Sequence, residues 1–189
     1  IGSILIIISI WVYYFFRDPE RYPINDESYL VSPADGLITD VSERSGPEEL
    51  RLENTTFIRV SIFMNVFNCH VNRTPIAGKI TDIFYKPGKF FNASLDKASE
   101  DNERNYYKIK DTNENQIIVV QIAGLIARRI KCDLTENESV TIGQRYGLIR
   151  FGSRVDVYFP KNFNILVNKG QTSISGETIL ADFNLTKSK

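Results

Sequence analysis

The sequence has little of what metal and disulfide chemistry require. Its 189 residues contain one histidine, His70, and two cysteines, Cys69 and Cys132. A zinc hydrolase with two or more histidine ligands is therefore excluded, and we expect no metal site. The two cysteines have neither the spacing of metal ligands nor the density of a disulfide scaffold. This predicts a reduced chain that faces the cytosol.

The sequence also lacks a net charge, because 23 lysines and arginines balance 23 aspartates and glutamates. It contains no dense basic stripe with interleaved aromatic residues. Without either feature the chain has no electric field that would attract a polyanion. We therefore expect no nucleic-acid partner.

Long amphipathic helical patterns are absent after residue 16. The rest of the chain consists of short runs of alternating apolar and polar residues, separated by turn residues. A chain of this length can bury one sizeable hydrophobic core. The sequence therefore predicts a mainly β fold, with a single domain of short strands over residues 17–189.

The first sixteen residues are different, since all but three of them are apolar and Arg17 ends the run abruptly. We predict a membrane-associating helix over residues 1–16, with its aromatic end at the level of the lipid headgroups. Sixteen helical residues span about 24 Å, which is short for crossing a bilayer. Because Ile1 is not an initiator methionine, we expect the end of a longer membrane helix. A buried core segment is the alternative.

A Gly-Ser pair interrupts the most regular strand pattern of the chain. Residues 146–160, YGLIRFGSRVDVYFP, read as one continuous strand whose odd-numbered residues, such as Val155 and Val157, face the core. This parity also turns Ser153 inward, directly after Gly152, and glycine weakens a strand. Ser153 as an ordinary small strand residue is one interpretation of this pattern.

The single histidine follows a second alternating strand. Even-numbered residues of 57–66 are apolar, and the same parity brings His70 to the inward side. A half-buried histidine with a structural role is one interpretation. A Ser-His-Asp hydrolase built from Ser153, His70 and Asp35 is another, although the sequence has no G-x-S-x-G motif.

Several segments, taken in their order along the chain, resemble one enzyme family. They are FFRDPER, SPADG, FNCHVNRTPIAGKI, YKPGKFFNASLDKASEDNER, QIAGLIARRI, and RFGSRVDVYFP followed by KGQTSISGETILADF. Together they resemble the short form of phosphatidylserine decarboxylase, a self-processing proenzyme that depends on a pyruvoyl group. The resemblance covers nearly the whole chain.

The resemblance implies a cut between Gly152 and Ser153. Ser153 Oγ attacks the Gly152 carbonyl, the resulting ester eliminates, and Ser153 becomes the covalent pyruvoyl cofactor. The products are residues 1–152, the beta chain, and residues 153–189, the alpha chain, which form a heterodimer; a homo-oligomer is left open. The pyruvoyl group then decarboxylates phosphatidylserine through a Schiff base, giving phosphatidylethanolamine and carbon dioxide.

The resemblance also assigns roles to side chains. Asp35 matches an aspartate that pairs with a histidine to assist self-cleavage. His70 matches the first of two family histidines, whereas Arg73 stands in the place of the second. We therefore expect His70 to serve mainly decarboxylation, as proton donor or as a positioner of the substrate carboxylate. A further role of His70 in cleavage stays open.

Residue type and position indicate side chains that would meet the lipid substrate at a membrane. Aromatic rings would enter the interface and cations would meet the anionic headgroup. The candidates are Phe90, Phe91, Lys89, Arg73, Arg128 and Arg129. A solvated loop and an ordinary basic strand end explain the same residues. With a phospholipid substrate, we expect the protein at the cytoplasmic face of the cell membrane.

The strand and glycine rhythm of residues 138–160 is also typical of lipoyl or biotinyl carrier domains. Such a domain would make the chain a membrane-tethered binding module. Carrier domains display a lysine at a hairpin tip, and no convincing Met-Lys or Asp-Lys turn is present. The rhythm indicates instead a related, barrel-sandwich-like architecture. A membrane-anchored metallopeptidase, a third class, fails because there is only one histidine.

Overall fold

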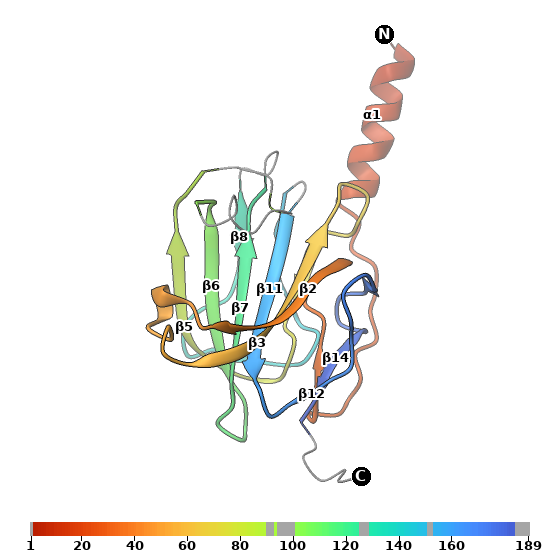
Figure 1. The fold of residues 1–189 in the computed structure, drawn as a ribbon. Helices are drawn as coiled ribbons and strands as arrows, with labels where there is room; N and C mark the ends of the chain where they lie inside the picture. Colours follow the sequence, from red (N-terminus) through yellow and green to blue (C-terminus); the bar gives the residue numbers. More distant parts are fainter. Residues whose placement is uncertain (1, 90–92, 94–100, 125–128, 151–152, 184–189) are drawn as a thin grey trace.

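A computed structural model of the chain describes residues 2–89, 93, 101–124, 129–150 and 153–183. One helix precedes a domain of short strands (Figure 1). The helices are α1 (Gly2–Phe15) and the 3₁₀ helix η1 (Glu48–Leu50). The strands are β1 (Tyr29–Val31), β2 (Gly36–Ser45), β3 (Thr56–Met64), β4 (Val71–Arg73), β5 (Gly78–Lys86), β6 (Arg104–Lys110), β7 (Gln116–Ile122), β8 (Ile130–Cys132), β9 (Ser139–Val140), β10 (Arg145–Ile149), β11 (Ser153–Pro160), β12 (Asn164–Ile165), β13 (Thr172–Ser173) and β14 (Ile179–Asp182).

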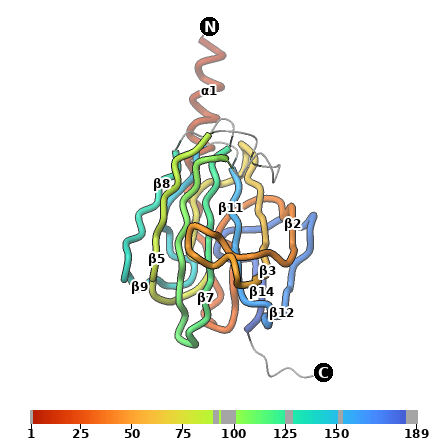
Figure 2. Tube along the Cα trace, turned by 60° about the vertical axis from the view of Figure 1, so that its left-hand side comes forward, coloured from red at the N-terminus to blue at the C-terminus, as the bar shows by residue number. Residues whose placement is uncertain are grey.

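The strands form three antiparallel sheets. The largest has eight strands in the order β13-β2-β3-β11-β7-β6-β5-β9 and curls into a half-barrel (Figures 1 and 2). Two three-stranded sheets, β1-β14-β12 and β4-β10-β8, complete the domain. The prediction of a mainly β fold is therefore confirmed.

The main hydrophobic core lies on one face of the large sheet. Strand β11 pairs with β3 on one side and with β7 on the other, so that Val157 lies between Val60 and Val119. All three side chains are fully buried. Burial of each such side chain contributes about 1.5–3 kcal/mol, which explains why the period-two apolar pattern fixes the register.

The prediction of one continuous strand over residues 146–160 is wrong. Strand β10 ends at Ile149 in a three-stranded sheet, whereas β11 begins at Ser153 in the centre of the eight-stranded sheet. The chain therefore changes sheets immediately before Ser153, although the inward parity of that residue is confirmed. Gly152 lies outside the described residues.

Two other patterns in the sequence continue past the ends of the strands that carry them. The apolar run that begins at Gln116 is not one strand, because β7 ends at Ile122 and β8 begins only at Ile130. Strand β3 ends at Met64, and a turn follows, so its alternation does not continue to His70. Periodicity alone does not reveal where a buried strand stops.

The outer side of β11 is also buried, contrary to simple alternation. Arg154 and Asp156 are 3% and 2% exposed. They form a bidentate ion pair, with Arg154 Nε and Nη2 lying 2.6 and 2.7 Å from the two carboxylate oxygens. A second apolar cluster, which includes Phe57 and Ile118, covers this face of the sheet. The ion pair offsets the free-energy cost of burying each charge, which a single unpaired charge would incur in full.

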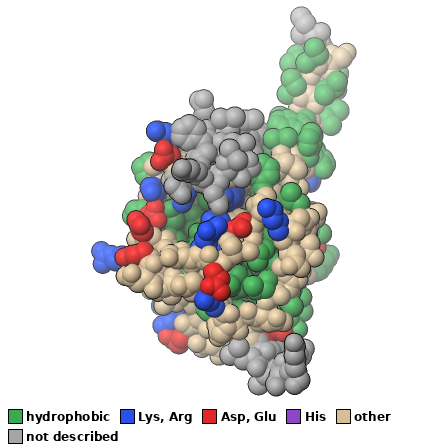
Figure 3. Space-filling view, in the orientation of Figure 1, with side chains coloured by type: hydrophobic (Ala, Val, Ile, Leu, Met, Phe, Trp, Pro, Cys, Tyr) green, Lys and Arg blue, Asp and Glu red, His purple; other side chains and the backbone are tan. Residues whose placement is uncertain are grey.

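Helix α1 stands out from the domain, and its surface is almost entirely apolar (Figure 3). Ile7 is 66% exposed and Ile10 65%, whereas Phe15, at the last turn, is buried against the domain. The predicted apolar helix is therefore present over Gly2–Phe15. Among the described residues, no helix combines the length and the apolar character needed to cross a membrane.

Candidate active site

Ser153 opens the central strand β11 and points into the core. It pairs with Met64, the last residue of β3, and is fully buried. Its Oγ has no hydrogen-bond partner among the described residues. A buried hydroxyl that makes no hydrogen bond costs about 1–3 kcal/mol, so its place in the core requires an explanation.

Asp35 lies in the loop between β1 and β2. This loop packs on the end of β3, close to the Met64 position that pairs with Ser153. Gly36 follows it and packs so closely on β3 that a Cβ there would lie 2.2 Å from the Phe63 carbonyl oxygen. Ser153 approaches β3 from the other side, at Met64. Two strand spacings, about 10 Å, therefore separate the two backbones.

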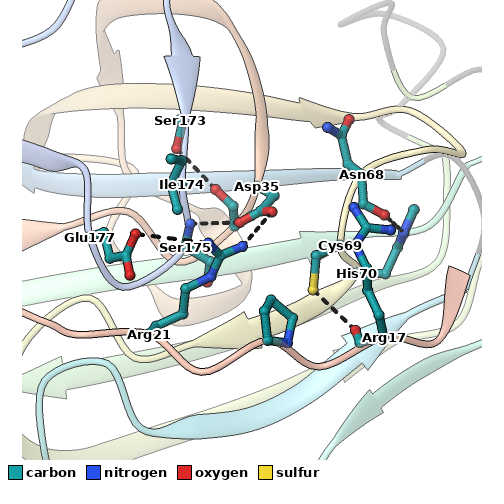
Figure 4. A network of polar contacts seen from close by, with 12 residues as sticks. Arg17, Arg21, Asp35, Asn68, Cys69, His70, Ser173, Ile174, Ser175 and Glu177 are labelled. Carbon is teal, nitrogen blue, oxygen red and sulfur yellow. Dashed lines mark hydrogen bonds and ion pairs between the residues drawn. The ribbon is translucent and has the colours of Figure 1, made fainter. Parts of the chain in front are cut away.

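The Asp35 carboxylate is bound by two segments that are distant in sequence (Figure 4). Arg21 Nη2 lies 2.9 Å from Oδ2, and the backbone N–H of Ser175 donates to Oδ1 at 2.8 Å. Ser175 Oγ donates to the carbonyl of Pro33 at 3.0 Å. The SPADG loop is thus fixed by Arg21, which precedes it in the sequence, and by Ser175, which lies near the end of the chain.

His70 lies in a separate contact group beside the end of α1 (Figure 4). Its ring is 2% exposed and packs on Phe15, with ring centroids 4.2 Å apart. The guanidinium of Arg17 donates to the Phe67 carbonyl at 2.9 Å, and this bond ties the end of α1 to the turn that precedes His70. Nδ1 lies 2.9 Å from the Asn68 carbonyl, whereas Nε2 has no partner within the described chain.

These contacts determine the proton state of His70. A carbonyl oxygen only accepts hydrogen bonds, so Nδ1 carries the proton and Nε2 carries the lone pair. Burial lowers the pKa of His70 to about 4, against a smaller rise from the Asn68 carbonyl, and the positive charge of Arg17 lowers it further. At neutral pH the ring is therefore neutral, with a free basic nitrogen.

Ser153, His70 and Asp35 are not hydrogen-bonded to one another in the described structure. Neither Ser153 Oγ nor His70 Nε2 has a partner in the described part of the chain, and both Asp35 oxygens have other donors. No Ser-His-Asp hydrogen-bond chain is formed. This arrangement differs from that of a hydrolase triad.

Arg73 is buried and bonded to the segment that follows α1 and to the turn before β10. It is 5% exposed, and its guanidinium donates to the Gly143 and Pro19 carbonyls at 3.2 and 3.0 Å. Nη2 also lies 3.2 Å from the carboxylate of Asp18. Arg73 therefore fixes the segment that leaves α1, and it makes no contact with Ser153 Oγ.

The remaining substrate-binding candidates are only partly described. Phe90, Phe91 and Arg128 lie outside the described residues. Lys89 is exposed and lies 3.7 Å from the carboxylate of Asp101. Arg129 lines a cavity of about 380 Å³ that also contains two cations missed by the sequence analysis, Lys131 and Arg150.

Metal ligands do not gather at this site. Over the described residues, no three His, Cys, Asp or Glu side chains are grouped so that they could hold a metal ion. Both cysteines are free, Cys69 buried and Cys132 half-buried.

Comparison with known proteins identifies the family. A profile of the phosphatidylserine decarboxylase family matches residues 8–181. This chain belongs to that family. A phosphatidylserine decarboxylase proenzyme of Pelagibacter ubique (strain HTCC1062) is 65% identical over 181 residues, which cover 96% of this chain and 84% of the relative.

Two further relatives carry the same name, phosphatidylserine decarboxylase proenzyme. The protein of Rickettsia typhi (strain ATCC VR-144 / Wilmington) is 56% identical over 190 residues, covering 100% of this chain and 82% of its own. That of Ruegeria pomeroyi (strain ATCC 700808 / DSM 15171 / DSS-3) is 54% identical over 182 residues, covering 96% and 83%. The word proenzyme describes these relatives as precursors.

For this decarboxylase, we predict that Phe15→Ala raises the pKa of His70 from about 4 toward its ordinary value of 6.5. The substitution removes the ring that packs on the imidazole, so water can stabilise the charged form. Because the chain has one histidine, its ring resonance in NMR reports this pKa directly. Tyr13→Ala, at an 86% exposed position on the same helix, serves as the control. An unchanged pKa in Phe15→Ala would show that Phe15 does not bury His70.

Proposed function

We propose that this protein decarboxylates phosphatidylserine to phosphatidylethanolamine and carbon dioxide after cutting itself between Gly152 and Ser153. The observation that carries the proposal is the buried Ser153, whose Oγ has no partner, at the start of the central strand in a member of this family. Family membership over residues 8–181 disfavours a lipoyl- or biotinyl-like binding module.

Ser153 has the surroundings that a pyruvoyl group would need. The group would form from Ser153 itself, so no separate binding site is required. Its ketone would supply an electron sink for the bond that loses carbon dioxide. Met64 and Val155 are fully buried beside this position, so the protein would keep bulk water from the reacting carbon.

We propose His70 as the neutral base of this reaction. Its Nε2 lone pair is free, and its lowered pKa keeps it unprotonated at neutral pH. Nε2 can therefore take a proton from the ammonium group of the substrate and later return it to the carbon that has lost its carboxylate. The sequence predicts His70 as a proton donor. On this proposal, its Nε2 must accept a proton before it can donate one.

The two chains would stay together after the cut. Strand β11 of the alpha chain is held between β3 and β7 of the beta chain, and β13 and β14 pair with β2 and β1. Cutting before Ser153 leaves all of these strand pairings in place. This supports a heterodimer of residues 1–152 and 153–189.

The substrate is a lipid, and one end of the molecule is suited to meet it. Helix α1 stands at the end of the domain where β11 begins (Figure 1). Its apolar surface is uncovered, and the cations Arg129, Lys131 and Arg150 line one cavity. Apolar helices and cations together favour the surface of an anionic membrane. We therefore assign the protein to the cytoplasmic face of the cell membrane, with α1 in the lipid.

The mass of the purified protein under denaturing conditions tests the proposed function. Two chains that correspond to residues 1–152 and 153–189 are expected, and the shorter should lack a free amino terminus. Reductive amination of its pyruvoyl group should make it sequenceable. A single active chain of 189 residues would contradict the proposal.

The membrane role of α1 leads to a further prediction. Deleting residues 1–10 removes most of its exposed apolar residues but keeps Phe15 on His70. Activity on bilayer phosphatidylserine should fall by roughly tenfold or more, because each lost apolar anchor weakens lipid binding. Activity on a short-chain, water-soluble analogue should stay within about twofold. Equal losses on both substrates would mean that the segment stabilises the domain instead.

Asp35 is expected to act in self-cleavage. Asp35→Asn keeps an oxygen for the Ser175 N–H but removes the negative charge. We expect the cut to be slowed by roughly 100-fold, the scale of one acid–base group. Electrophoresis at timed intervals after synthesis follows the loss of the uncut chain. Arg21→Gln removes the ion partner but keeps the carboxylate, so it should be cut much faster than Asp35→Asn. Equal rates in both variants would contradict a role for the Asp35 charge.

A further inference from the structure

Three buried amide side chains form a hydrogen-bonded row inside the domain. Asn105 Nδ2 donates to Gln121 Oε1 at 3.1 Å, and Gln121 Nε2 donates to Asn72 Oδ1 at 2.9 Å. Asn72 and Gln121 are fully buried, and Asn105 is 4% exposed. Buried amides reduce stability unless they are bonded, so a row of three in a core requires an explanation.

The row fixes the direction of its last member. Because Asn105 occupies Gln121 Oε1 with a donor, Gln121 must turn its Nε2 toward Asn72. That nitrogen occupies Asn72 Oδ1, so Asn72 must turn its own Nδ2 away from the row. The acceptor recorded for Nδ2 is the sulfur of Met64, at 3.8 Å. A thioether is a weak acceptor, so this N–H group is available to a stronger one.

Two strand pairings place the neighbours of this weakly bonded N–H group beside Ser153. Met64, which Asn72 contacts, is the residue paired with Ser153 across β3 and β11. Gln121 pairs with Val155, two residues further along β11, and is therefore a diagonal neighbour of Ser153 on the same face. Directly opposed and diagonal residues lie about 5 and 7–8 Å apart. The pairings therefore place the amide row beside the reacting hydroxyl.

We propose that Asn72 is a catalytic residue of pyruvoyl formation, whose Nδ2–H stabilises the oxygen that leaves Ser153. This role rests on the self-cleavage proposed above. It concerns a different step from the first attack: the breaking of the Cβ–Oγ bond. Gln121 and Asn105 are positioning residues, which hold the Asn72 amide in the donating orientation.

The step can be written with all atoms assigned. After Ser153 Oγ has displaced the backbone nitrogen, Oγ joins the Gly152 carbonyl carbon to Ser153 Cβ as an ester. A base removes the Cα proton, the Cβ–Oγ bond breaks, and its electron pair stays on Oγ, now part of the Gly152 carboxylate. The resulting dehydroalanine tautomerises to an imine, which water hydrolyses to the ketone and ammonia. Negative charge grows on Oγ, where an N–H donor stabilises it most.

Asn72→Asp tests this role with almost no change in shape. The carboxylate still accepts from Gln121 but repels the departing carboxylate. We expect pyruvoyl formation to slow by at least roughly 100-fold, as for the loss of one oxyanion donor. Hydroxylamine should then trap the ester and release an alpha chain that begins with serine. Mass spectrometry identifies this chain, because it is heavier than the pyruvoyl chain by one ammonia molecule.

Two outcomes would overturn the assignment. Pyruvoyl formation at the wild-type rate in Asn72→Asp would exclude the donor. A folded Asn72→Asp chain that resists hydroxylamine would place the block before the ester, at the first attack. Asn162→Asp, the same change at an exposed position in the turn after β11, is the matched control and should form pyruvoyl at the wild-type rate.

Gln121→Glu gives an independent test that does not depend on how Asn72→Asp folds. At neutral pH the glutamate cannot donate to Asn72, so the ester should again be trapped by hydroxylamine. Protonation of the glutamate at lower pH restores a donor, and processing relative to wild type should recover. Absence of recovery would contradict the positioning role. If the wild-type chain itself forms no pyruvoyl, the proposed function fails, whatever the amides do.

Discussion

Ser153→Ala is expected to leave a single uncut chain without measurable decarboxylase activity. On the proposed mechanism, the variant removes the atom that attacks the Gly152 carbonyl, and it removes the source of the ketone. The substitution should not unfold the protein, because Ser153 Oγ has no partner to lose among the described residues. Denaturing electrophoresis and release of labelled carbon dioxide measure the two effects separately.

Ser61→Ala is the matched control for this experiment. Ser61 is also fully buried, lies on the neighbouring strand β3, and has an Oγ without a partner in the described structure. It pairs with Asp156 and faces away from the amide row. The control should be cut and active, at about the wild-type level. An uncut Ser153→Ala chain that still releases carbon dioxide would falsify the pyruvoyl mechanism.

The parts of the fold that the sequence predicts are those governed by alternation along one strand. The period-two pattern correctly turns Ser153, Val155 and Val157 toward the core. It fails where two sheets meet, because residues on both sides of the change are apolar and the pattern continues across it. The change of sheet just before Ser153 is therefore visible only in the structure.

The burial of His70 was predicted, but for the wrong reason. Strand β3 ends six residues before it, and the ring is covered by Phe15 from α1. A contact between residues 15 and 70 depends on tertiary packing, which no local pattern contains. The same holds for the pKa of His70: its ordinary value is close to neutral, but burial lowers it to about 4.

One residue of the amide row, Gln121, stands out in the sequence. Gln121 is the only polar residue between Ile117 and Ala123, in an otherwise apolar run. A single polar residue in a buried strand requires a partner, which indicates either a hydrogen-bond network or a site. The partners, Asn72 and Asn105, come from two other strands, so their identity follows only from the fold.

His70→Ala is expected to reduce turnover by roughly 10²–10⁴-fold while the chain is still cut into two. The reason is the free Nε2 lone pair, which can carry a proton from the substrate ammonium group to the carbon that loses its carboxylate. Self-cleavage should suffer less, because His70 makes no hydrogen bond to Ser153 or Asp35 in the described structure. Chain separation and carbon dioxide release must therefore be followed separately in the same preparation.

The pH dependence of turnover distinguishes proton transfer from a structural effect of the substitution. A base whose pKa is about 4 stays active as the pH falls through 6.5 and loses activity only near 4. The wild-type profile should therefore have its acid limb near 4, and this limb should move upward in Phe15→Ala, where the ring is less buried. His70→Gln cannot transfer a proton and should lack the limb altogether. An uncut His70→Ala chain would instead assign His70 to self-cleavage, together with Asp35 and Ser153.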